Sequence, residues 1–315
     1  MKLSHSYSIQ KFLDIYGPQD VFYTISGSPE REVMGFGDYQ VARNGDVTWV
    51  DYDALYHKAF TSGATVVIIN RLPDKLPEDL VLIVTTDPLY FFDSLIRNYI
   101  KSESLKSIWK KLPFRKQYSV GKNSRIYNGV QIGENVTIGD DVTIYPNVTI
   151  YPNVTICNNV TIHANSVIGA APFAHIKQKN GSYKKRNAWG DVIILDNVEI
   201  GALCTVDRGI TDSTIIGDGT KMDDHVHIGH DVWIGSDCYF SAQTAIAGYV
   251  RIKNDCTFWG RSGVANSLFV EEGTTLLSNS VITKNVVKRG LTLVGDPAEQ
   301  SYKYWKRMAL LRQTK

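Results

Sequence analysis

The sequence has little cysteine, no large excess of charge of one sign and no long hydrophobic run. Its 315 residues include four cysteines without a CxxC pair, so neither a thiol redox motif nor a cysteine zinc site is indicated. A formal net charge of +2 argues against a general role in binding nucleic acid. The apolar runs are well short of the ~20 residues that cross a bilayer, and the N-terminal segment does not resemble a signal peptide. We therefore expect a soluble cytoplasmic protein without a transmembrane segment.

The chain does contain an aliphatic or aromatic residue at nearly every sixth position between Val120 and Ile282. Helices repeat every 3.6 residues and strands every two, so neither element produces this spacing. A six-residue period is typical of a β-solenoid, in which three hexads form one triangular coil. The hexads predict eight coils, in three runs that span residues 120–168, 194–206 and 216–282.

The sixfold residues are expected to fill the interior of the solenoid. The position four residues later is usually small or β-branched, which predicts a second inward site. Cys204, Cys238 and Cys256 occupy this second site and are expected to be reduced core residues. Glycine often follows the sixfold residue, where a corner of the coil leaves no room for a Cβ atom.

Three segments stand apart from the repeat. Residues 1–100 are predicted to form an α/β domain, with buried strands at 64–70 and 80–85 and helices at 52–62 and from Asp87 onward. Residues 101–118 are predicted to be a basic helix and linker. The solenoid is predicted over 119–290, with an inserted basic loop at 173–191 that breaks the sixfold phase. Loops of this length on rigid scaffolds usually carry binding groups.

The C-terminal segment 296–315 is predicted to be a basic helix, with Asp296 as its cap and Pro297 in its first turn. Tyr304, Met308 and Leu311 mark one face of this helix. The helix either packs in an oligomer or against the end of the solenoid, or it binds an acidic partner. Its basic residues are Lys303, Lys306, Arg307 and Arg312.

The candidate catalytic residue is His230, which lies two positions after Ile228 and should face outward at a corner. Counting along the repeat places Asp207 one coil earlier and Gly248 one coil later. The same stacked column includes Arg208 below His230, and Asn266 with Ser267 two coils above it. Because successive coils are ~4.8 Å apart, these groups lie within reach of one substrate.

This set of groups suits acyl transfer to an amine. An imidazole titrates near neutral pH, so His230 can take the amine proton, and the carboxylate of Asp207 would fix its tautomer. The N–H of Gly248 would stabilise the oxyanion. Alternatively, His230 is a polar corner residue, but an inert scaffold would have no need of these three residues in one column.

A zinc site is a further interpretation of the histidines. Some trimeric β-helix enzymes bind zinc through three histidines, and His225 and His230 have a suitable H-x₄-H spacing. The preceding coil, residues 189–208, contains no third histidine. We therefore expect no metal, and we expect His227 to face the substrate or the solvent.

Several of these motifs resemble those of a known family. Val198-Glu199-Ile200-Gly201-Ala202, Val206-Asp207-Arg208-Gly209 and Asp223 with Ile228-Gly229-His230 are similar to the signature of UDP-3-O-acylglucosamine N-acyltransferases, the third-step enzymes of lipid A synthesis. The hexapeptide repeat also resembles that of the left-handed β-helix acyltransferases. The resemblance implies a mainly β fold, a left-handed parallel β-helix with an N-terminal α/β domain and a C-terminal helix.

The N-terminal domain resembles the uridine-recognition domain of the same family. The matching residues are Asp46-Val47-Thr48-Trp49, followed by Tyr52 and Tyr56. The resemblance implies that Trp49 and Tyr56 stack on the uracil ring, with Tyr52 as a substitute. Alternatively, these aromatic residues belong to the core of a small domain.

The resemblance further implies a homotrimer that transfers a (R)-3-hydroxyacyl chain from acyl carrier protein to the 2-amino group of a UDP-linked glucosamine, without a cofactor. His230 maps to the family's base and Gly248 to its oxyanion glycine. The basic tail helix would bind the acidic carrier protein. The candidate substrate-binding residues on the solenoid are Arg208, Asp223, His227, Asn266 and Ser267.

The chain also departs from the family pattern. Ser267 occupies the place of a second family histidine, and two loop motifs are changed to Ala171-Pro172-Phe173-Ala174 and Ala188-Trp189-Gly190. Asp224 and Asp231 replace asparagines that are usual in the signature. These changes leave an alternative open: an acetyl-CoA-dependent N-acetyltransferase that acts on a nucleotide-linked amino sugar for surface polysaccharide.

Overall fold

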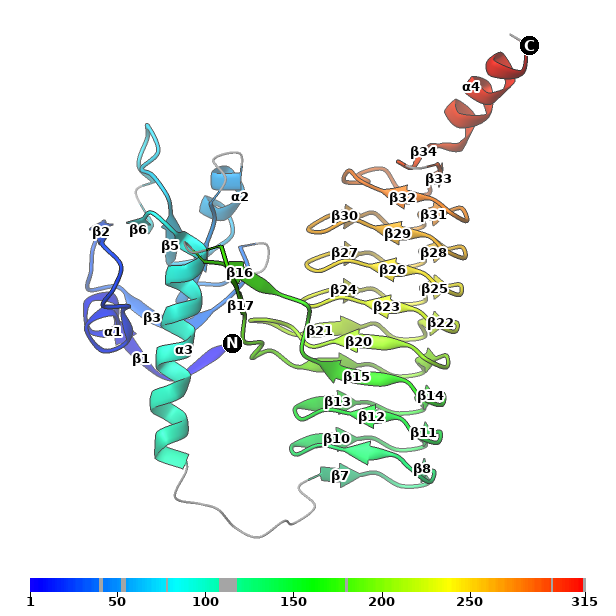
Figure 1. Cartoon of the computed structure of the whole chain (residues 1–315), viewed down its shortest axis with the longest axis horizontal. Helices are drawn as coiled ribbons and strands as arrows, with labels where there is room; N and C mark the ends of the chain where they lie inside the picture. The colour runs from blue at the N-terminus through cyan, green and yellow to red at the C-terminus, as the bar shows by residue number, and fades with distance from the viewer. Residues whose placement is uncertain are drawn as a thin grey trace. The chain divides into compact units, whose positions relative to one another are not determined.

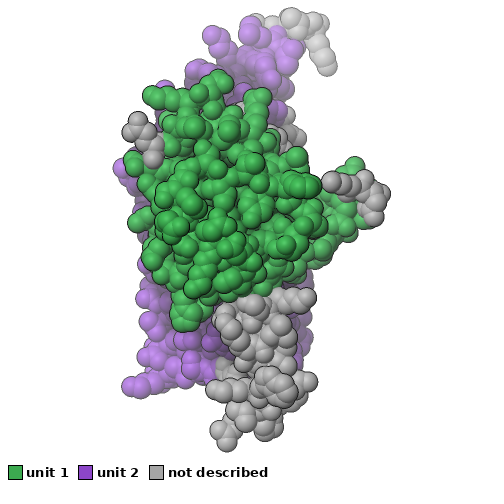
Figure 2. Space-filling view, turned by 90° about the vertical axis from the view of Figure 1, so that its left-hand side faces the viewer, with its two compact units in different colours: residues 1–114, 173–187 green, residues 115–172, 188–315 purple. Residues whose placement is uncertain are grey.

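The computed structural model describes residues 1–39, 42–51, 55–77, 79–107, 118–178, 181–295 and 297–313. The chain forms two compact units, one of residues 1–114 with 173–187 and the other of residues 115–172 with 188–315 (Figure 2). None of the described helices is both long and apolar enough to cross a membrane. Tyr52, Asp296 and residues 108–117 of the predicted linker lie outside the described residues.

The first unit contains a six-stranded mixed sheet and three helices (Figure 1). The predicted strands at 64–70 and 80–85 are confirmed as β5 and β6, and the helix predicted from Asp87 is α3. The helix predicted at 52–62 is described only as the short α2. In sheet order the strands are β1 (Lys2–Ser8), β3 (Glu32–Phe36), β4 (Asp46–Trp49), β5 (Val66–Ile69), β6 (Val81–Thr85) and β2 (Tyr23–Ser26). The helices are α1 (Ile9–Tyr16), α2 (Tyr56–Phe60) and α3 (Pro88–Ser107).

The inserted loop forms a hairpin of β16 (His175–Lys177) and β17 (Tyr183–Lys185). Residues 173–187 group with the first unit, although the flanking residues belong to the solenoid. The guanidinium of Arg186 forms an ion pair with Asp93 of α3, with 3.3 Å between Nε and Oδ1, and Asp93 also pairs with Arg97. Both partners are buried, with 6% of Arg186 and 2% of Asp93 exposed. This contact fastens the hairpin to the N-terminal unit.

The second unit is the predicted solenoid, and three parallel sheets form its faces (Figure 1). Face 1 consists of β7 (Tyr118–Val120), β10 (Val136–Ile138), β13 (Val154–Ile156), β18 (Val192–Ile194), β21 (Thr214–Ile216), β24 (Trp233–Ile234), β27 (Arg251–Ile252) and β30 (Phe269–Val270). Face 2 consists of β8 (Arg125–Ile126), β11 (Thr143–Ile144), β14 (Thr161–Ile162), β19 (Glu199–Ile200), β22 (Lys221–Met222), β25 (Tyr239–Phe240), β28 (Thr257–Phe258), β31 (Thr275–Leu276) and β33 (Thr292–Val294). Face 3 consists of β9 (Gln131–Ile132), β12 (Thr149–Ile150), β15 (Val167–Ala170), β20 (Thr205–Asp207), β23 (His227–Ile228), β26 (Ala245–Ile246), β29 (Gly263–Val264) and β32 (Val281–Ile282).

The register confirms the hexad count. Faces 1 and 3 have eight strands each, as eight coils require. Val206 pairs with Ile228, and Ile228 pairs with Ile246, so Asp207 belongs to the coil before His230 and Gly248 to the coil after it, as the counting predicted. The sixfold residues and the second inward site form one continuous buried core, including the three predicted core cysteines. Val120 and Ile126 are exceptions, because these residues of the first coil are 42% and 38% exposed.

Two features shape the corners: closely packed glycines, which the sequence indicated, and residues with a left-handed backbone, which it did not. The glycines that follow sixfold residues are packed against the next coil, as predicted: a Cβ on Gly133 would lie 2.5 Å from the nitrogen of Pro152. The left-handed residue, however, stands two positions later and is usually Asn or Asp, such as Asn135 with φ 56°. Asn and Asp adopt this conformation more easily than most side chains.

The C-terminal helix begins later than predicted. Helix α4 spans Ser301–Gln313, whereas the predicted helix begins near Pro297. The reason is β34 (Glu299–Gln300), which pairs antiparallel with β33 and keeps the preceding residues extended. In Figure 1, α4 continues beyond the last coil of the solenoid.

Candidate active site

The candidate site lies at one corner of the solenoid, where the chain passes from face 3 to face 1. His230 and Asp231 connect β23 to β24 at this corner. The two irregular connections of the solenoid, residues 171–191 and 208–213, pass through the same corner in the two preceding coils. We call this edge the His230 corner. Both insertions into the 18-residue step therefore occur in the two coils before His230.

The imidazole of His230 is held by its neighbour in the sequence. Nδ1 of His230 lies 2.9 Å from Oδ2 of Asp231, and the side chains are 17% and 0% exposed. Because a carboxylate only accepts hydrogen bonds, the proton of the neutral imidazole belongs on Nδ1. Within the described part of the chain, Nε2 has no hydrogen-bond partner. Its lone pair is therefore available to accept a proton.

Asp231 also organises the connection one coil below. Its Oδ2 accepts a hydrogen bond from the backbone N–H of Ile210 at 2.7 Å. Its Oδ1 accepts from the N–H groups of Thr211 and Asp212 at 3.3 and 3.1 Å. Its own N–H donates to the hydroxyl of Thr214 at 2.9 Å. One buried carboxylate thus joins the 209–213 connection to the imidazole.

The prediction that Asp207 fixes the tautomer of His230 is wrong. The nitrogen that this carboxylate was expected to engage is bonded to Asp231 instead. Asp207 ends β20, and its carboxylate lies 4.0 Å from Nε2 of His227. The sequence analysis did not assign Asp231 as the partner of Nδ1. Its backbone is left-handed (φ 55°), and its side chain reaches the preceding coil.

Gly248 lies directly against the imidazole. A Cβ at this position would stand 2.6 Å from both Cε1 and Nε2 of His230, far inside van der Waals contact. The absence of a side chain is therefore required by the ring itself. The N–H of Gly248 donates no hydrogen bond to any residue that the structure describes. The role of this N–H as an oxyanion donor stays a prediction.

The remaining residues of the column lie above Gly248, as predicted. The N–H of Ser267 donates to the carbonyl of Gly248 at 2.9 Å, and the amide of Asn266 donates to the Ser267 hydroxyl at 2.7 Å. The ring of Tyr249, which the sequence analysis missed, packs edge to face on His230 with 4.8 Å between centroids. These residues present an aromatic wall and polar groups next to the base.

Arg208 points down the column, away from His230. Its Nε donates to the carbonyl of Gly169 at 2.9 Å, and its Nη2 donates to the carbonyl of Pro152. Burial lowers the pKa of its guanidinium. These contacts fasten three coils together, so a contact between Arg208 and substrate stays a prediction.

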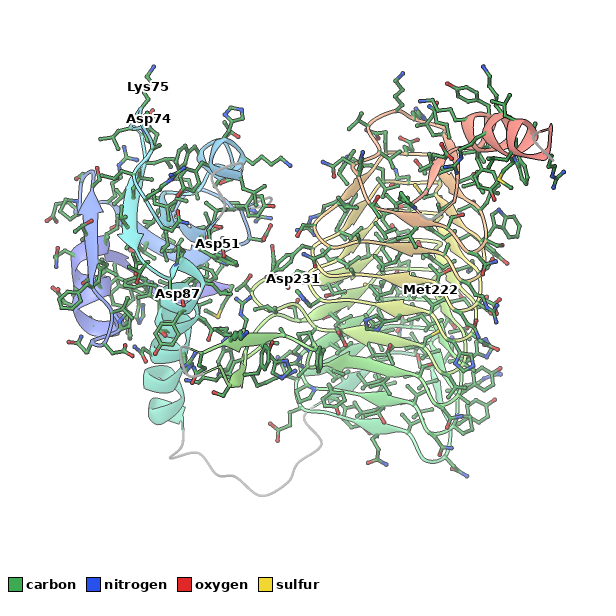
Figure 3. All side chains as sticks on the ribbon, turned by 45° about the horizontal axis from the view of Figure 1, so that its top comes forward. Asp51, Asp74, Lys75, Asp87, Met222 and Asp231 are labelled. Atoms are coloured by element: carbon green, nitrogen blue, oxygen red, sulfur yellow. The ribbon has the colours of Figure 1, made fainter. Side chains whose placement is uncertain are left out.

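Two other predicted residues lie elsewhere on the coil. Asp223 follows β22 on face 2, and its carboxylate accepts hydrogen bonds from the N–H groups of Asp224 and Ala242 at 2.8 and 3.2 Å. Figure 3 shows Asp231 and Met222, the neighbour of Asp223, on different sides of the solenoid. His227 is on the outer surface of face 3, where its Nδ1 meets the Thr205 hydroxyl at 2.7 Å. Within one chain, neither residue joins the His230 column.

In the N-terminal unit, the two described aromatic candidates have different environments. Tyr56 is 7% exposed, and its hydroxyl bonds to the side chain of Asn70 and the carbonyl of Arg71. This is the core role that the sequence left as an alternative, and the buried ring cannot stack on a base. Trp49 is half-buried at the end of β4 and packs near Phe92 with 6.5 Å between centroids.

A pair of carboxylates lies close to this region. Burial raises the pKa of Asp51, and the nearby negative charge of Asp87 raises this pKa further. A hydrogen bond from the backbone acts in the opposite direction. The side chains of Asp51 and Asp87 are labelled in Figure 3. The carbonyl of Asp51 accepts a hydrogen bond from Asn70 at 2.9 Å, which connects it to Tyr56. The stacking of Trp49 on uracil stays a prediction.

The basic residues of the tail helix are exposed, as the carrier-binding prediction requires. Arg307 pairs with Glu299 at 2.6 Å and lies over the ring of Tyr304. Lys303 lies over the ring of Tyr302 at 5.9 Å. Lys306 and Arg312 are exposed on the same helix. Their binding role stays a prediction.

Comparison with known proteins identifies relatives of this chain. The family model described as bacterial transferase hexapeptide (six repeats) matches residues 135–170. A Campylobacter lari protein named UDP-3-O-acylglucosamine N-acyltransferase is 33% identical over 306 residues, which cover 91% of this chain and 90% of that protein.

The chain belongs to the UDP-3-O-acylglucosamine N-acyltransferase family.

A second family member, UDP-3-O-acylglucosamine N-acyltransferase 2 of Sulfurimonas denitrificans, is 41% identical over 140 residues, which is 44% of each chain. Among solved structures, the UDP-N-acetylglucosamine acyltransferases of Bacteroides fragilis and Campylobacter jejuni have TM-scores of 0.53 and 0.51 at 24% and 21% identity. They cover 62% and 59% of this chain, and 75% and 70% of their own. These similarities concern the fold alone, and they confirm the predicted left-handed β-helix.

Proposed function

We propose that the protein transfers a (R)-3-hydroxyacyl chain from acyl carrier protein to the 2-amino group of a UDP-3-O-acylglucosamine, a step of lipid A biosynthesis. The observation that carries this proposal is the His230–Asp231 pair, with Gly248, whose N–H donates to no described residue, packed against the same imidazole. These groups would supply a base and an oxyanion donor. The relative that matches 91% of the chain is named UDP-3-O-acylglucosamine N-acyltransferase.

The chemistry follows from the positions of these groups. The sugar amine attacks the thioester carbonyl while Nε2 of His230 takes a proton from the nitrogen. The N–H of Gly248 stabilises the negative charge that develops on the carbonyl oxygen. The tetrahedral intermediate then collapses: the C–S bond breaks, the amide remains, and the imidazolium returns the proton to the departing thiolate. Asp231 stabilises the imidazolium between these two steps.

Several of the predicted acceptor-binding residues are described. Trp49 is the described aromatic residue left to stack on uracil, since Tyr56 is in the core and Tyr52 lies outside the described residues. Asn266 and Ser267 would contact the sugar or the acyl chain next to Gly248. Asp223 and His227 would contribute from a second subunit of a homotrimer. We also propose that the protein is a homotrimer and that it is located in the cytoplasm.

The acetyl-CoA-dependent alternative is not favoured. It was based on the altered loop motifs, but the relative that matches 91% of the chain is named as an N-acyltransferase of UDP-3-O-acylglucosamine.

The proposed reaction is tested by mass spectrometry of purified protein mixed with UDP-3-O-acylglucosamine and 3-hydroxyacyl carrier proteins of several chain lengths. A parallel reaction contains acetyl-CoA with UDP- and dTDP-amino sugars. A mass gain of one hydroxyacyl chain supports the proposal and identifies the preferred length. Acetyl transfer alone would instead assign the protein to surface-sugar synthesis.

The control for this assay is His230→Ala. This change removes the base and leaves the buried core untouched, so the circular dichroism spectrum should stay the same. Turnover should fall at least ~100-fold, as expected for loss of a general base. A variant with near-normal turnover would refute the mechanism.

A further inference from the structure

Tyr249 has an unusual backbone for a residue with a large side chain. Its φ is 59°, in the left-handed region, where a bulky side chain is an outlier. In other coils the same position of this corner is filled by residues with small polar side chains: Asn135, Asn153, Asp231 and Ser267. Short polar side chains tolerate this conformation because they can bond locally to the backbone. Tyr249 is therefore more strained than a smaller residue would be at this position.

The bond between coils at this corner does not depend on a tyrosine side chain. The backbone N–H of Tyr249 donates to the carbonyl of His230 at 2.9 Å, which any residue with an N–H could do. The next coil repeats the bond, since the N–H of Ser267 donates to the carbonyl of Gly248 at the same distance of 2.9 Å. Main-chain groups thus close the corner in both coils. Strained residues cluster at active sites, where the strain is part of the function.

The ring of Tyr249 lies against the imidazole of His230. The two ring centroids are 4.8 Å apart and the ring planes are nearly perpendicular, at 89°, which is a favourable arrangement of two aromatic rings. The imidazole therefore has three neighbours: Asp231 at Nδ1, the backbone of Gly248 beside Cε1 and Nε2, and the tyrosine ring. The last torsion of a histidine side chain has a broad preference. Contacts of this kind are needed to select one orientation of the ring.

We propose that Tyr249 is a positioning residue, whose ring holds the imidazole of His230 in the orientation required for acyl transfer. The inference rests on the proposed function, in which Nε2 of His230 takes a proton from the attacking amine. The hydrogen bond to Asp231 fixes one nitrogen but still allows the plane of the imidazole to swing about that bond. The perpendicular contact with Tyr249 limits this swing. The strained backbone is kept because it places a large ring beside the base.

The test uses variants that separate the ring, its hydroxyl group and the backbone strain. Tyr249→Phe keeps the ring and removes the hydroxyl group. Tyr249→Asn removes the ring and introduces a residue that tolerates the left-handed backbone. The matched control is Leu203→Asn, because Leu203 has the same backbone (φ 58°) but lies between faces 2 and 3 and is 48% exposed. Acyl transfer by the full chain gives kcat and KM, and thermal unfolding gives Tm.

We expect Tyr249→Asn to lower kcat about 10- to 100-fold, because a misplaced base transfers protons less efficiently. The KM for each substrate should stay within about 2-fold, since binding does not use the tyrosine ring. Its Tm should not fall, because relief of the strained backbone offsets loss of the ring contact. Tyr249→Phe and Leu203→Asn should both keep kcat within about 2-fold, as neither change alters the ring beside His230.

Two further readouts distinguish positioning from a general effect on the fold. In a His230→Ala background, Tyr249→Asn should cause no further loss of turnover, because the ring acts only through the imidazole. The second readout is the magnetic resonance signal of the Nδ1 proton of His230 in protein with isotope-labelled histidine, identified by its absence from His230→Ala. This proton should exchange with water more rapidly in Tyr249→Asn than in wild type or Tyr249→Phe.

Several results would overturn the proposal. Wild-type kcat in Tyr249→Asn would show that the ring does not position the base. An equal loss of kcat in Tyr249→Phe would assign the effect to the hydroxyl group, and a raised KM with unchanged kcat would make Tyr249 a substrate contact. A lower Tm with an additive loss in the His230→Ala background would show a structural role only. Absence of acyl transfer by the wild type would refute the proposed function, and proton exchange at His230 would still decide whether Tyr249 holds the imidazole.

Discussion

Asp231 is the residue whose replacement tests the site most sharply. In Asp231→Ala, the N–H groups of Ile210, Thr211 and Asp212 lose their acceptor in a buried position, and His230 loses the partner of Nδ1. Each buried donor left without a partner costs about 1–3 kcal/mol. We expect the free energy of unfolding to fall by about 3 kcal/mol and kcat to fall at least ~100-fold, because the base loses its orientation and tautomer.

The isosteric change Asp231→Asn separates acceptor geometry from charge. The amide oxygen can replace Oδ2, which receives the two shorter bonds from His230 and Ile210 at 2.9 and 2.7 Å. The amide nitrogen then faces Thr211 and Asp212, whose bonds to Oδ1 are 3.3 and 3.1 Å. The asparagine variant should therefore keep kcat within about 10-fold and lose about 1–2 kcal/mol of stability.

The assay pairs steady-state acyl transfer at saturating substrates with calorimetric unfolding. Asp255→Ala is the matched control, since Asp255 has the same left-handed backbone (φ 57°) but is exposed at another corner. Wild-type kcat and stability in Asp231→Ala would refute the argument. Equal losses in the alanine and asparagine variants would show that the negative charge, rather than the geometry of the acceptor, is what His230 requires.

Three further predictions follow from other contacts. Gly248→Ala should reduce kcat at least ~100-fold without unfolding the protein, because the new Cβ would stand 2.6 Å from the ring of His230. Turnover measures the loss, circular dichroism checks the fold, and an active variant would refute the close packing. Phe258→Ala should lower the free energy of unfolding by about 3–5 kcal/mol, because the ring of Phe258 stacks on Phe240 in the core with 4.8 Å between centroids. Urea unfolding measures the change, and a loss below about 1 kcal/mol would contradict the prediction. Burial raises the pKa of Cys204 to about 11 and also raises the pKa of Cys157, so little of either thiol is ionised at pH 8. An alkylating reagent should therefore react slowly with half-buried Cys157 of the native protein and not with Cys204. Rapid labelling of Cys204 without denaturant would disprove its burial.

The solenoid was predictable because its interior repeats one local rule. Each sixfold residue must point inward in every coil, so the spacing alone located Ile228, Ile246 and their register. The same counting placed Gly248 and Ser267 above His230, because the coils between them contain no insertion.

The missed features depend on tertiary contacts rather than on the spacing of the apolar residues. Asp231 reaches the connection of the preceding coil only because its backbone is left-handed. The late start of α4 depends on the antiparallel pairing of Glu299 and Gln300 with β33, two residues that carry no strand pattern. The core position of Tyr56 depends on Asn70, which is distant in the sequence. Such contacts arise from tertiary structure and leave no signal in a single sequence.

The antiparallel strand β34 also affects how the protein behaves in a crowded solution. The terminal coils of a solenoid leave open backbone groups, which can pair with another parallel strand and so allow growth into fibres. On face 2, β34 pairs with β33 in the opposite direction, and α4 follows immediately. A chain shortened before Glu299 should keep its coils but gain a free edge, so its first defect would be self-association rather than unfolding.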